Sequence, residues 1–480
     1  MAQHPDLDDG IQLQFADGNV DVVISAARRF QLHANMLRKA STRFNELLAG
    51  NGARLTKVTL ERGITTRYCV YLDVHGDAWE GPWTLERAAV DSRGNSRSFG
   101  FENENARSVP PVHRNFTMLL RAMYGKEIQF ELGSISETLD AALGILECAK
   151  AIGATSFVTT RIESPLLAHG QALYLNISRN PVAWIDLALQ LRSRAIMTEA
   201  VIHTVGRYNE LHSPSLPNGV WKINRLPSEM VPLIQKKLEE LTTNIKKLHT
   251  FGATYYFDDM KRNAPVGNAS TEPISKKNYM EDVFLWMART MFQQAFTVML
   301  IHELSLSSPD LGYSGCVKLH QNGQAYLDDA TVQQFHASGR FPVSKKAGPY
   351  IKGKVNDIKK MVSDKAKDLM DSKCQLNTTR NPVPWFTCID VDVVELGFEP
   401  LESPGYEFDE NDMEGSDELE DEDADEEDDA EEQEGSDEQM QEGSDEQEEE
   451  GNGEQGEEET GEVPEVKEEE EDEDSLFVPM

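Results

Sequence analysis

The N-terminal part of the chain shows a pattern typical of two short strands followed by two helices. Residues 20–24 form a β-branched run, and residues 29–33 form a second short run after a small loop. From Ala34 onward, apolar residues recur at three- and four-residue steps, which is the spacing of one helix face. Ser41 divides this run, and serine often begins a helix by accepting a hydrogen bond from a backbone N–H. The sequence therefore predicts the order strand, strand, helix, helix.

The pattern between residues 49 and 165 is less regular but still mixed. We predict strands over 55–60 and 67–74 and a short strand over 126–130. A segment rich in Gly, Asn, Ser and Pro predicts a loop before residue 112. Helical spacing returns in two segments, 115–124 and 136–150.

Further along, helical spacing dominates. We predict two helices within 181–205, joined near Arg192. Further helices are predicted over 228–249, 280–304 and 356–371, and a strand over 385–394. In residues 228–249 the apolar positions alternate strictly between three- and four-residue steps, as in a coiled-coil seam. This seam either packs inside the chain's own helical bundle or pairs with another chain.

Charge divides the 480 residues into two parts. The chain has 84 acidic and 46 basic residues, and residues 401–480 hold 41 of the acids and only one base, Lys467. The remaining 400 residues are close to neutral. Because the final 80 residues contain few apolar side chains, they cannot bury enough surface to offset the entropy of ordering. We therefore predict a disordered acidic tail over 401–480.

Several broad classes are disfavoured by composition. The N-terminus lacks the apolar core of a secretory signal, and the most apolar stretch, 283–304, contains Arg289 and other polar residues that a membrane span disfavours. The five cysteines are widely spaced without a CxxC pair, which argues against a disulfide framework or a zinc clasp. We expect an intracellular protein, cytoplasmic or nuclear, with no membrane partner.

The strand–strand–helix–helix segment resembles the BTB/POZ domain, an interaction module, and in particular the BTB domain-containing proteins of filamentous fungi. The resemblance rests on the residues Asp21, Phe30, His33, Leu37, Ser41, Phe44, Leu47, Tyr124 and Gly125. It implies an α+β fold and a homodimer. The corresponding organisation is an N-terminal extension over 1–17, a BTB/POZ-like domain over 18–165 with an insertion at about 61–111, a mainly α-helical region over 166–400, and the acidic tail.

Two departures from that family affect the expected partners. The residues before the third predicted helix, 109–114, contain no acid where cullin-binding members carry a hydrophobic-x-Glu pattern. Ala34 follows His33 where corepressor-binding members place a basic residue, so Asp21 lacks that partner. An adaptor role in a cullin-type ubiquitin ligase is therefore an alternative and not the main prediction.

Catalytic and metal-binding patterns are weak in this sequence. Residues 348–354 have the outline of a phosphate loop, but Val355 replaces the hydroxyl residue that would hold magnesium. Residues 312–316 lack the second glycine of a nucleophile elbow because Cys316 stands there. The histidines and cysteine between 302 and 336 do not follow a zinc spacing. We predict no catalytic, cofactor-binding or metal-binding residues, and no enzyme activity.

The tail carries one repeat. The sequence Glu-Gly-Ser-Asp-Glu occurs three times and places two acids directly after Ser416, Ser436 and Ser444. These serines suit an acid-directed kinase, and low-complexity drift explains the repeat equally well. Basic residues near 28–43 are better explained as a solvated face than as a nucleic-acid site, and a polyanionic tail repels nucleic acid.

We therefore predict a non-catalytic protein–protein interaction module that self-associates and docks partners through its BTB-like domain. A second possibility is that the acidic tail binds basic proteins such as histones. The sequence does not identify the partner, the compartment, cullin binding, or the roles of the tail and of the 61–111 insertion.

Overall fold

The computed structural model describes residues 13–75, 82–96, 109–128, 130, 133–258, 276–337 and 343–397. Its internal contacts divide the chain into residues 1–404 and residues 405–480, and every described residue belongs to the first unit. The predicted disordered tail and its serines Ser416, Ser436 and Ser444 lie outside the described residues. Among the described residues, no helix is long and apolar enough to cross a membrane.

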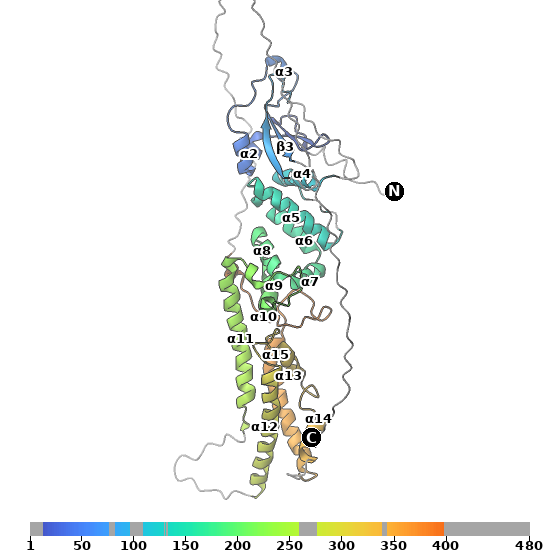
Figure 1. Ribbon diagram of the computed structural model, residues 1–480, viewed down its shortest axis with the longest axis vertical. Coiled ribbons are helices and arrows are strands. Elements are labelled where there is room, and N and C mark those ends of the chain that lie inside the picture. Colours follow the sequence, from blue (N-terminus) through green and yellow to red (C-terminus); the bar gives the residue numbers. More distant parts are fainter. Residues whose placement is uncertain are drawn as a thin grey trace, which may run out of the picture. The chain divides into compact units, whose positions relative to one another are not determined.

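The fold is mixed α+β, with many helices and one four-stranded sheet. The strands are β1 (Val20–Val23), β2 (Arg29–Leu32), β3 (Tyr68–Val74) and β4 (Trp83–Ala88), in the spatial order β2-β1-β3-β4. β1 is antiparallel to β2 and parallel to β3, and β3 is antiparallel to β4. Because β3 and β4 both fall within the segment 61–111, that segment supplies two of the four strands. Figure 1 labels β3.

Helices follow the sheet as the apolar spacing predicts. They are α1 (Ala34–Ala40), α2 (Thr42–Leu47), α3 (Lys57–Glu61), α4 (Pro111–Met123) and α5 (Ile135–Ala151). The predicted strand over 55–60 is wrong, since Thr56 begins α3 by accepting a hydrogen bond from the N–H of Thr59. The described residues of 126–130 also form no strand. At Thr56 local hydrogen bonding outweighs the β propensity of the side chains.

A second group of helices continues the same hydrophobic core. These are α6 (Thr159–Ala168), α7 (Gln171–Arg179), α8 (Pro181–Leu191), α9 (Arg194–Gly206) and α10 (Tyr208–His212), with short 3-10 turns at Thr155–Phe157, Ile223–Arg225 and Ser228–Met230. Helix α9 is contacted by α7, α8 and α11, and almost all of its residues are buried. Polar residues on α9 therefore need partners inside the protein.

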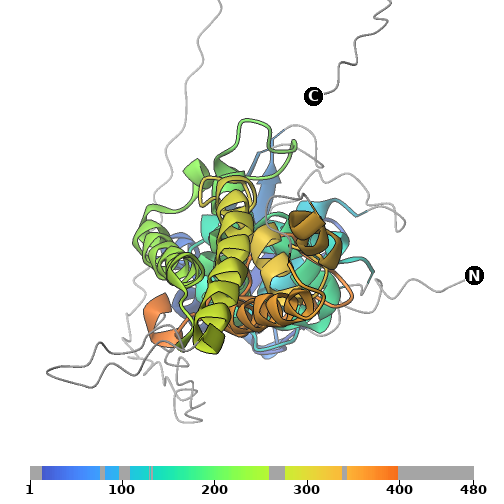
Figure 2. The ribbon, with the colours of Figure 1, turned by 90° about the horizontal axis from the view of Figure 1, so that it is seen from below.

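The remaining helices are α11 (Val231–Thr254), α12 (Lys276–His302), α13 (Tyr313–Gln321), α14 (Asp329–Ala337) and α15 (Ala347–Met370). Helix α12 lies between α11 and α15 (Figure 2). Of the heptad-spaced residues of α11, Ile234, Leu241, Ile245 and Leu248 are buried and the other two are half-buried, and α11 contacts α9, α12 and α15. The seam of α11 is thus used within the chain, which was one of the two alternatives.

Residues 371–391 follow α15 as an extended segment, which we call the C-terminal strap. The predicted strand over 385–394 is wrong, because these residues form no sheet and the segment ends in a 3-10 turn, η7 (Val393–Leu396). Within the strap, the N–H of Lys373 donates to the carbonyl of Thr387 at 2.8 Å. Most of the other partners of the strap lie on helix α9 or near it.

Candidate functional site

The residues that carried the BTB/POZ resemblance mostly form the core and the caps of the N-terminal region. Phe30, Leu37 and Phe44 are fully buried, whereas Leu47 is only half-buried. Ser41 begins α2 by accepting a hydrogen bond from the N–H of Phe44, and its hydroxyl donates to a distant carbonyl in the loop after α5. Their spacing is explained by packing two helices on a small sheet.

Asp21, His33, Tyr124 and Gly125 are satisfied within the fold. Asp21 pairs with Arg29, and this hydrogen bond raises the pKa of Arg29. The hydroxyl of Tyr124 accepts a hydrogen bond from the backbone N–H of His33 at 2.7 Å, and burial raises the pKa of Tyr124 to about 12. Gly125 ends α4 with a positive φ of 73°, which glycine adopts without strain.

A buried polar cluster ties the C-terminal strap to helix α9. Glu199 and His203 lie one turn apart on α9 and are almost inaccessible to solvent. The Glu199 carboxylate accepts hydrogen bonds from the backbone N–H groups of Gln375 at 2.7 Å and Leu376 at 3.0 Å. His203 contacts Glu199 at 3.2 Å and accepts a hydrogen bond from the indole N–H of Trp385 at 3.1 Å.

Together with Cys374, Glu199 and His203 place three potential metal-ligand atoms within 4.8 Å of one another. Their hydrogen bonds argue against a metal site. The Trp385 indole can only donate, so Nδ1 of His203 must be its acceptor and Nε2 must carry the proton that faces Glu199. A metal at Nε2 would require the opposite tautomer. The cluster is best understood as a structural clasp.

The strap approaches α9 closely along the same helix face. A side chain at Gly206 would place its Cβ only 2.2 Å from the carbonyl oxygen of Phe386, so only glycine allows this contact. The guanidinium of Arg207 stacks over the Trp385 ring at 4.7 Å and donates to the carbonyl of Ser178 at 2.7 Å. The face of α9 is therefore already occupied by the chain itself.

Lys359 on α15 is another buried charged residue with a structural role. Its ammonium donates to the carbonyls of Gly323, Tyr326 (2.8 Å) and Leu327 (3.2 Å). Burial lowers the pKa of Lys359, although Asp329 opposes that shift. All three donors of the ammonium are used to hold the loop between α13 and α14, so none remains for a ligand.

The weak catalytic patterns do not form sites. Gly348 and Gly353 both lie inside α15, where backbone N–H groups serve the helix. Cys316 is fully buried in α13, and burial raises the pKa of its thiol to about 12, which leaves little reactive thiolate at neutral pH. Glu303 pairs with Lys318 at 2.7 Å.

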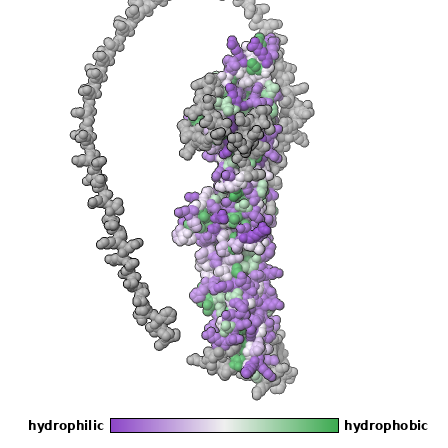
Figure 3. Space-filling model, turned by 90° about the vertical axis from the view of Figure 1, so that its right-hand side faces the viewer, coloured by the Kyte–Doolittle hydropathy of each residue, from purple (hydrophilic) through white to green (hydrophobic). Residues whose placement is uncertain are grey.

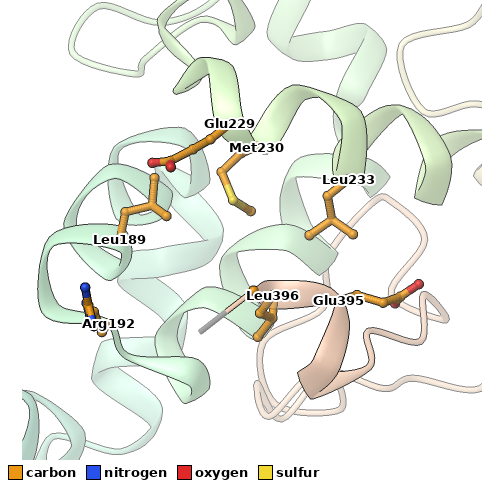
Figure 4. Close-up of a pocket in the computed structure, with 8 residues that line it drawn as sticks. Leu189, Arg192, Glu229, Met230, Leu233, Glu395 and Leu396 are labelled. Atoms are coloured by element: carbon orange, nitrogen blue, oxygen red, sulfur yellow. The ribbon is translucent and has the colours of Figure 1, made fainter. Parts of the chain in front are cut away.

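A pocket of about 550 Å³ lies between helix α8, the start of α11 and the turn η7. Figure 4 shows its apolar and charged lining, formed by Leu189, Arg192, Glu229, Met230, Leu233, Glu395, Leu396 and Gly397. Glu395 is held by Lys236 at 2.6 Å and Lys237 at 2.7 Å, and these contacts lower its pKa to about 2. The pocket is open and carries no cluster of groups suited to catalysis.

The surface of helix α12 is the most unusual feature of the helical region. The molecular face drawn in Figure 3 is mostly hydrophilic, with small separate hydrophobic groups. On α12, by contrast, Val283, Trp286, Val298 and Ile301 are all exposed, with Trp286 at 49% and Ile301 at 64%. Large apolar side chains in a row on one helix are a common signature of a protein contact surface.

An aromatic–cation stack lies at the Trp286 end of this surface. The guanidinium of Arg289 lies 3.7 Å from the ring centre of Tyr256 and 5.3 Å from that of Trp286. Arg289 is fixed in place because its Nε donates to the carbonyl of Tyr255 at 2.8 Å. Trp, Tyr and Arg are the residue types that dominate binding energy in protein interfaces. A pre-ordered group of all three also loses little entropy on binding.

A comparison with known families found a match in this region. Residues 257–368, from the end of α11 to α15, match the fungal FF domain family. The FF domain is a protein-interaction domain. The match covers less than a quarter of the chain. No curated protein and no solved structure matched the chain.

The BTB/POZ identification is therefore wrong: the family found is the FF domain, it lies in another part of the chain, and nothing found supports a BTB/POZ domain. The physical reason is that apolar residues at these steps are required wherever a sheet packs on two short helices. The burial of Phe30, Leu37 and Phe44 in the core accounts for their spacing. The dimer and the cullin adaptor role that the resemblance implied lose their basis with it.

Sequence reasoning missed the residues that distinguish the helical region. The exposed positions Trp286 and Ile301 lie in the most apolar stretch, 283–304, where the apolar spacing predicted a helix but not which of its residues are exposed. A signal was present, since Arg289 and Gln293 interrupt that stretch at positions that a fully buried helix would avoid. The clasp residues Glu199 and Trp385 gave no local signal, because 185 intervening residues separate them in sequence.

Proposed function

We propose that the protein is a non-catalytic docking protein and that the exposed face of helix α12 is its main contact surface. The observation that carries this proposal is the row of exposed apolar residues on α12, headed by Trp286, inside the segment that matches the FF domain. Its partners are proteins, because a flat helical face suits another helix or a protein surface better than a small molecule.

The arrangement of Trp286, Tyr256 and Arg289 suits a protein contact at the Trp286 end of the α12 surface. Trp286 and Tyr256 meet edge to face, with ring centres 6.3 Å apart, and both are well exposed. The cation of Arg289 is only 8% exposed and stays stacked behind them. A partner that covers the two rings gains aromatic burial without having to order these side chains first.

Site-specific photocrosslinking tests the proposal. A benzophenone amino acid replaces Val298 in the full chain, and after irradiation in the expressing cells the adducts are identified by mass spectrometry. The same label at Val58 on α3, which is also about half exposed, is the matched control. We expect discrete protein adducts from position 298 and few from position 58. Equal labelling at the two positions would contradict the proposal.

A second candidate function involves residues 401–480. Their 41 acidic side chains against one basic side chain favour binding to basic proteins such as histones. Such an attraction is screened over about 8 Å at physiological salt. Binding that survives roughly 0.5 M salt, or deletion of residues 402–475, would argue against this role.

A further inference from the structure

The exposed face of helix α12 continues for six turns as an uncharged stripe. Its positions alternate between steps of three and four residues, and they are Met280, Val283, Met287, Thr290, Gln294, Thr297 and Ile301. All except the half-buried Met287 are exposed. This is the spacing of a coiled-coil seam, here turned toward solvent and not toward the chain's own core.

The other sides of α12 are already occupied. Leu285, Phe292 and Phe296 are buried, in keeping with the contacts that α12 makes with α11 and α15. Phe296 packs so tightly on α11 that a Cβ at Gly252 would approach its ring to 2.3 Å. Among the described side chains of α12, the exposed ones are those of the uncharged stripe except Met287, together with Trp286, Val298 and His302.

The stripe is complementary to itself when the helix is turned end for end. If two α12 helices pair antiparallel about a two-fold axis beside Phe292, Val283 of one copy faces Ile301 of the other. Thr290 then faces Gln294 near the axis, and Trp286 faces Val298. Met287 faces Thr297, and Met280 lies beyond the paired part of the helix. No charged residue lies in the seam. A two-fold interface requires this kind of self-complementarity.

We propose that the stripe on α12 is an interface with a second copy of this chain, formed by antiparallel pairing of the two helices. The inference rests on the proposed function, and it names the partner of the α12 face. The hydroxyls of Thr290 and Thr297 donate to carbonyls of their own helix at 2.8 Å, so neither needs a polar partner in the seam. Gln294 favours this register, because its side-chain amide can donate to the hydroxyl oxygen of Thr290 in the other copy. Trp286 and Val298 flank the seam and extend the contact.

The size of the stripe predicts a weak dimer. From residue 280 to residue 301 the helix is about 32 Å long and about 10 Å wide. Interfaces well below about 1,200 Å² are typical of transient contacts. We therefore expect a dissociation constant of roughly 10–100 μM for the full chain. Each copy carries a net charge of −38, and the seam has none, so added salt should strengthen the dimer by screening this repulsion.

Sedimentation velocity of the full chain tests the inference, over about 1 to 300 μM protein and about 0.05 to 0.5 M salt. Ile301→Glu and Val283→Lys, each alone, should weaken the dimer at least about tenfold by placing an unpaired charge in the seam. Mixing the two variants in equal amounts should restore it, because the new carboxylate of one chain then faces the new ammonium of the other. Val58→Glu on α3 is the control and should change nothing.

Three results would overturn the inference: a monomer at every concentration, a dimer that both single variants leave intact, or a dimer that salt weakens. Restoration by mixing cannot arise from misfolding, so it separates a true seam from a damaged fold. If the chain is monomeric while position 298 still crosslinks a different protein, the proposed docking function stands and the self-pairing fails. If position 298 crosslinks nothing, the docking function fails as well.

Discussion

The N-terminal α+β region and the helices α11 to α15 use their conspicuous apolar residues in opposite ways. In the first region Phe30, Phe44 and Phe116 are fully buried. In the second, α12 buries Phe292 on one side and exposes Trp286 on the other. Buried apolar residues report how a chain folds, whereas a row of exposed ones reports what it contacts. The second region therefore says more about function.

The largest expected effect in this comparison is Phe44→Ala. Phe44 is inaccessible to solvent in α2, so its truncation leaves a cavity and should lower the free energy of unfolding by about 3–5 kcal/mol. Urea denaturation followed by circular dichroism measures this loss. A loss below about 1 kcal/mol would mean that the N-terminal core is not packed as described.

A smaller loss is expected for Glu199→Gln. The new amide keeps one oxygen but directs an NH₂ group toward backbone donors, so the N–H of Gln375 or Leu376 loses its acceptor. We expect a loss of about 2 kcal/mol and faster hydrogen exchange in the C-terminal strap. Glu239→Gln, at an exposed position of α11, is the matched control. Unchanged exchange at residues 375 and 376 would show that the strap is held by other contacts.

Glu395→Gln should give a smaller and pH-dependent effect. Contacts with Lys236 and Lys237 lower the pKa of Glu395 to about 2 from 4.5, so its carboxylate stabilises the fold above pH 4.5 and loses this effect as the pH falls toward 2. After allowance for solvent screening, we expect a loss of about 1 kcal/mol at neutral pH. The difference between the two proteins should disappear near pH 2. A constant difference across that range would rule out the ion pairs as its cause.

The smallest effect on stability is expected for Trp286→Ala, which removes a larger side chain than Phe44→Ala does. Because Trp286 is half exposed, the unfolding free energy should fall by less than about 1 kcal/mol. Photocrosslinking from position 298 should nevertheless decrease strongly. A large loss of stability would instead place Trp286 in the core and remove the contrast between the two regions.

The sequence predicted local structure where neighbouring residues determine it. The steps from Ala34 to Leu48 predicted two helices, and Ser41 does begin the second one. The sequence did not predict local structure that depends on contacts with distant residues. The strap around Trp385 is extended because it packs against Gly206 and hydrogen-bonds to His203 on α9. No sequence pattern within residues 371–391 indicates these contacts.

The candidate site was harder to predict than the fold. Apolar steps in 283–304 correctly predicted a helix, but periodicity alone does not tell which apolar face is covered. On α12 the covered face is set by α11 and α15, which are distant in sequence. The BTB/POZ prediction was wrong for a related reason. The spacing of Phe30, Leu37 and Phe44 meets packing requirements that many folds share.

The clasp between Glu199 and the strap has a consequence for how the protein is made. Glu199 lies 176 residues before Gln375, so its buried carboxylate has no amide partners until that later segment has left the ribosome. At typical rates of about 5–20 residues per second, the delay is roughly 10–35 s. During that interval α7, α8 and α11 can already cover most of α9, but the face that receives the strap stays open and the Glu199 carboxylate lacks its two amide donors.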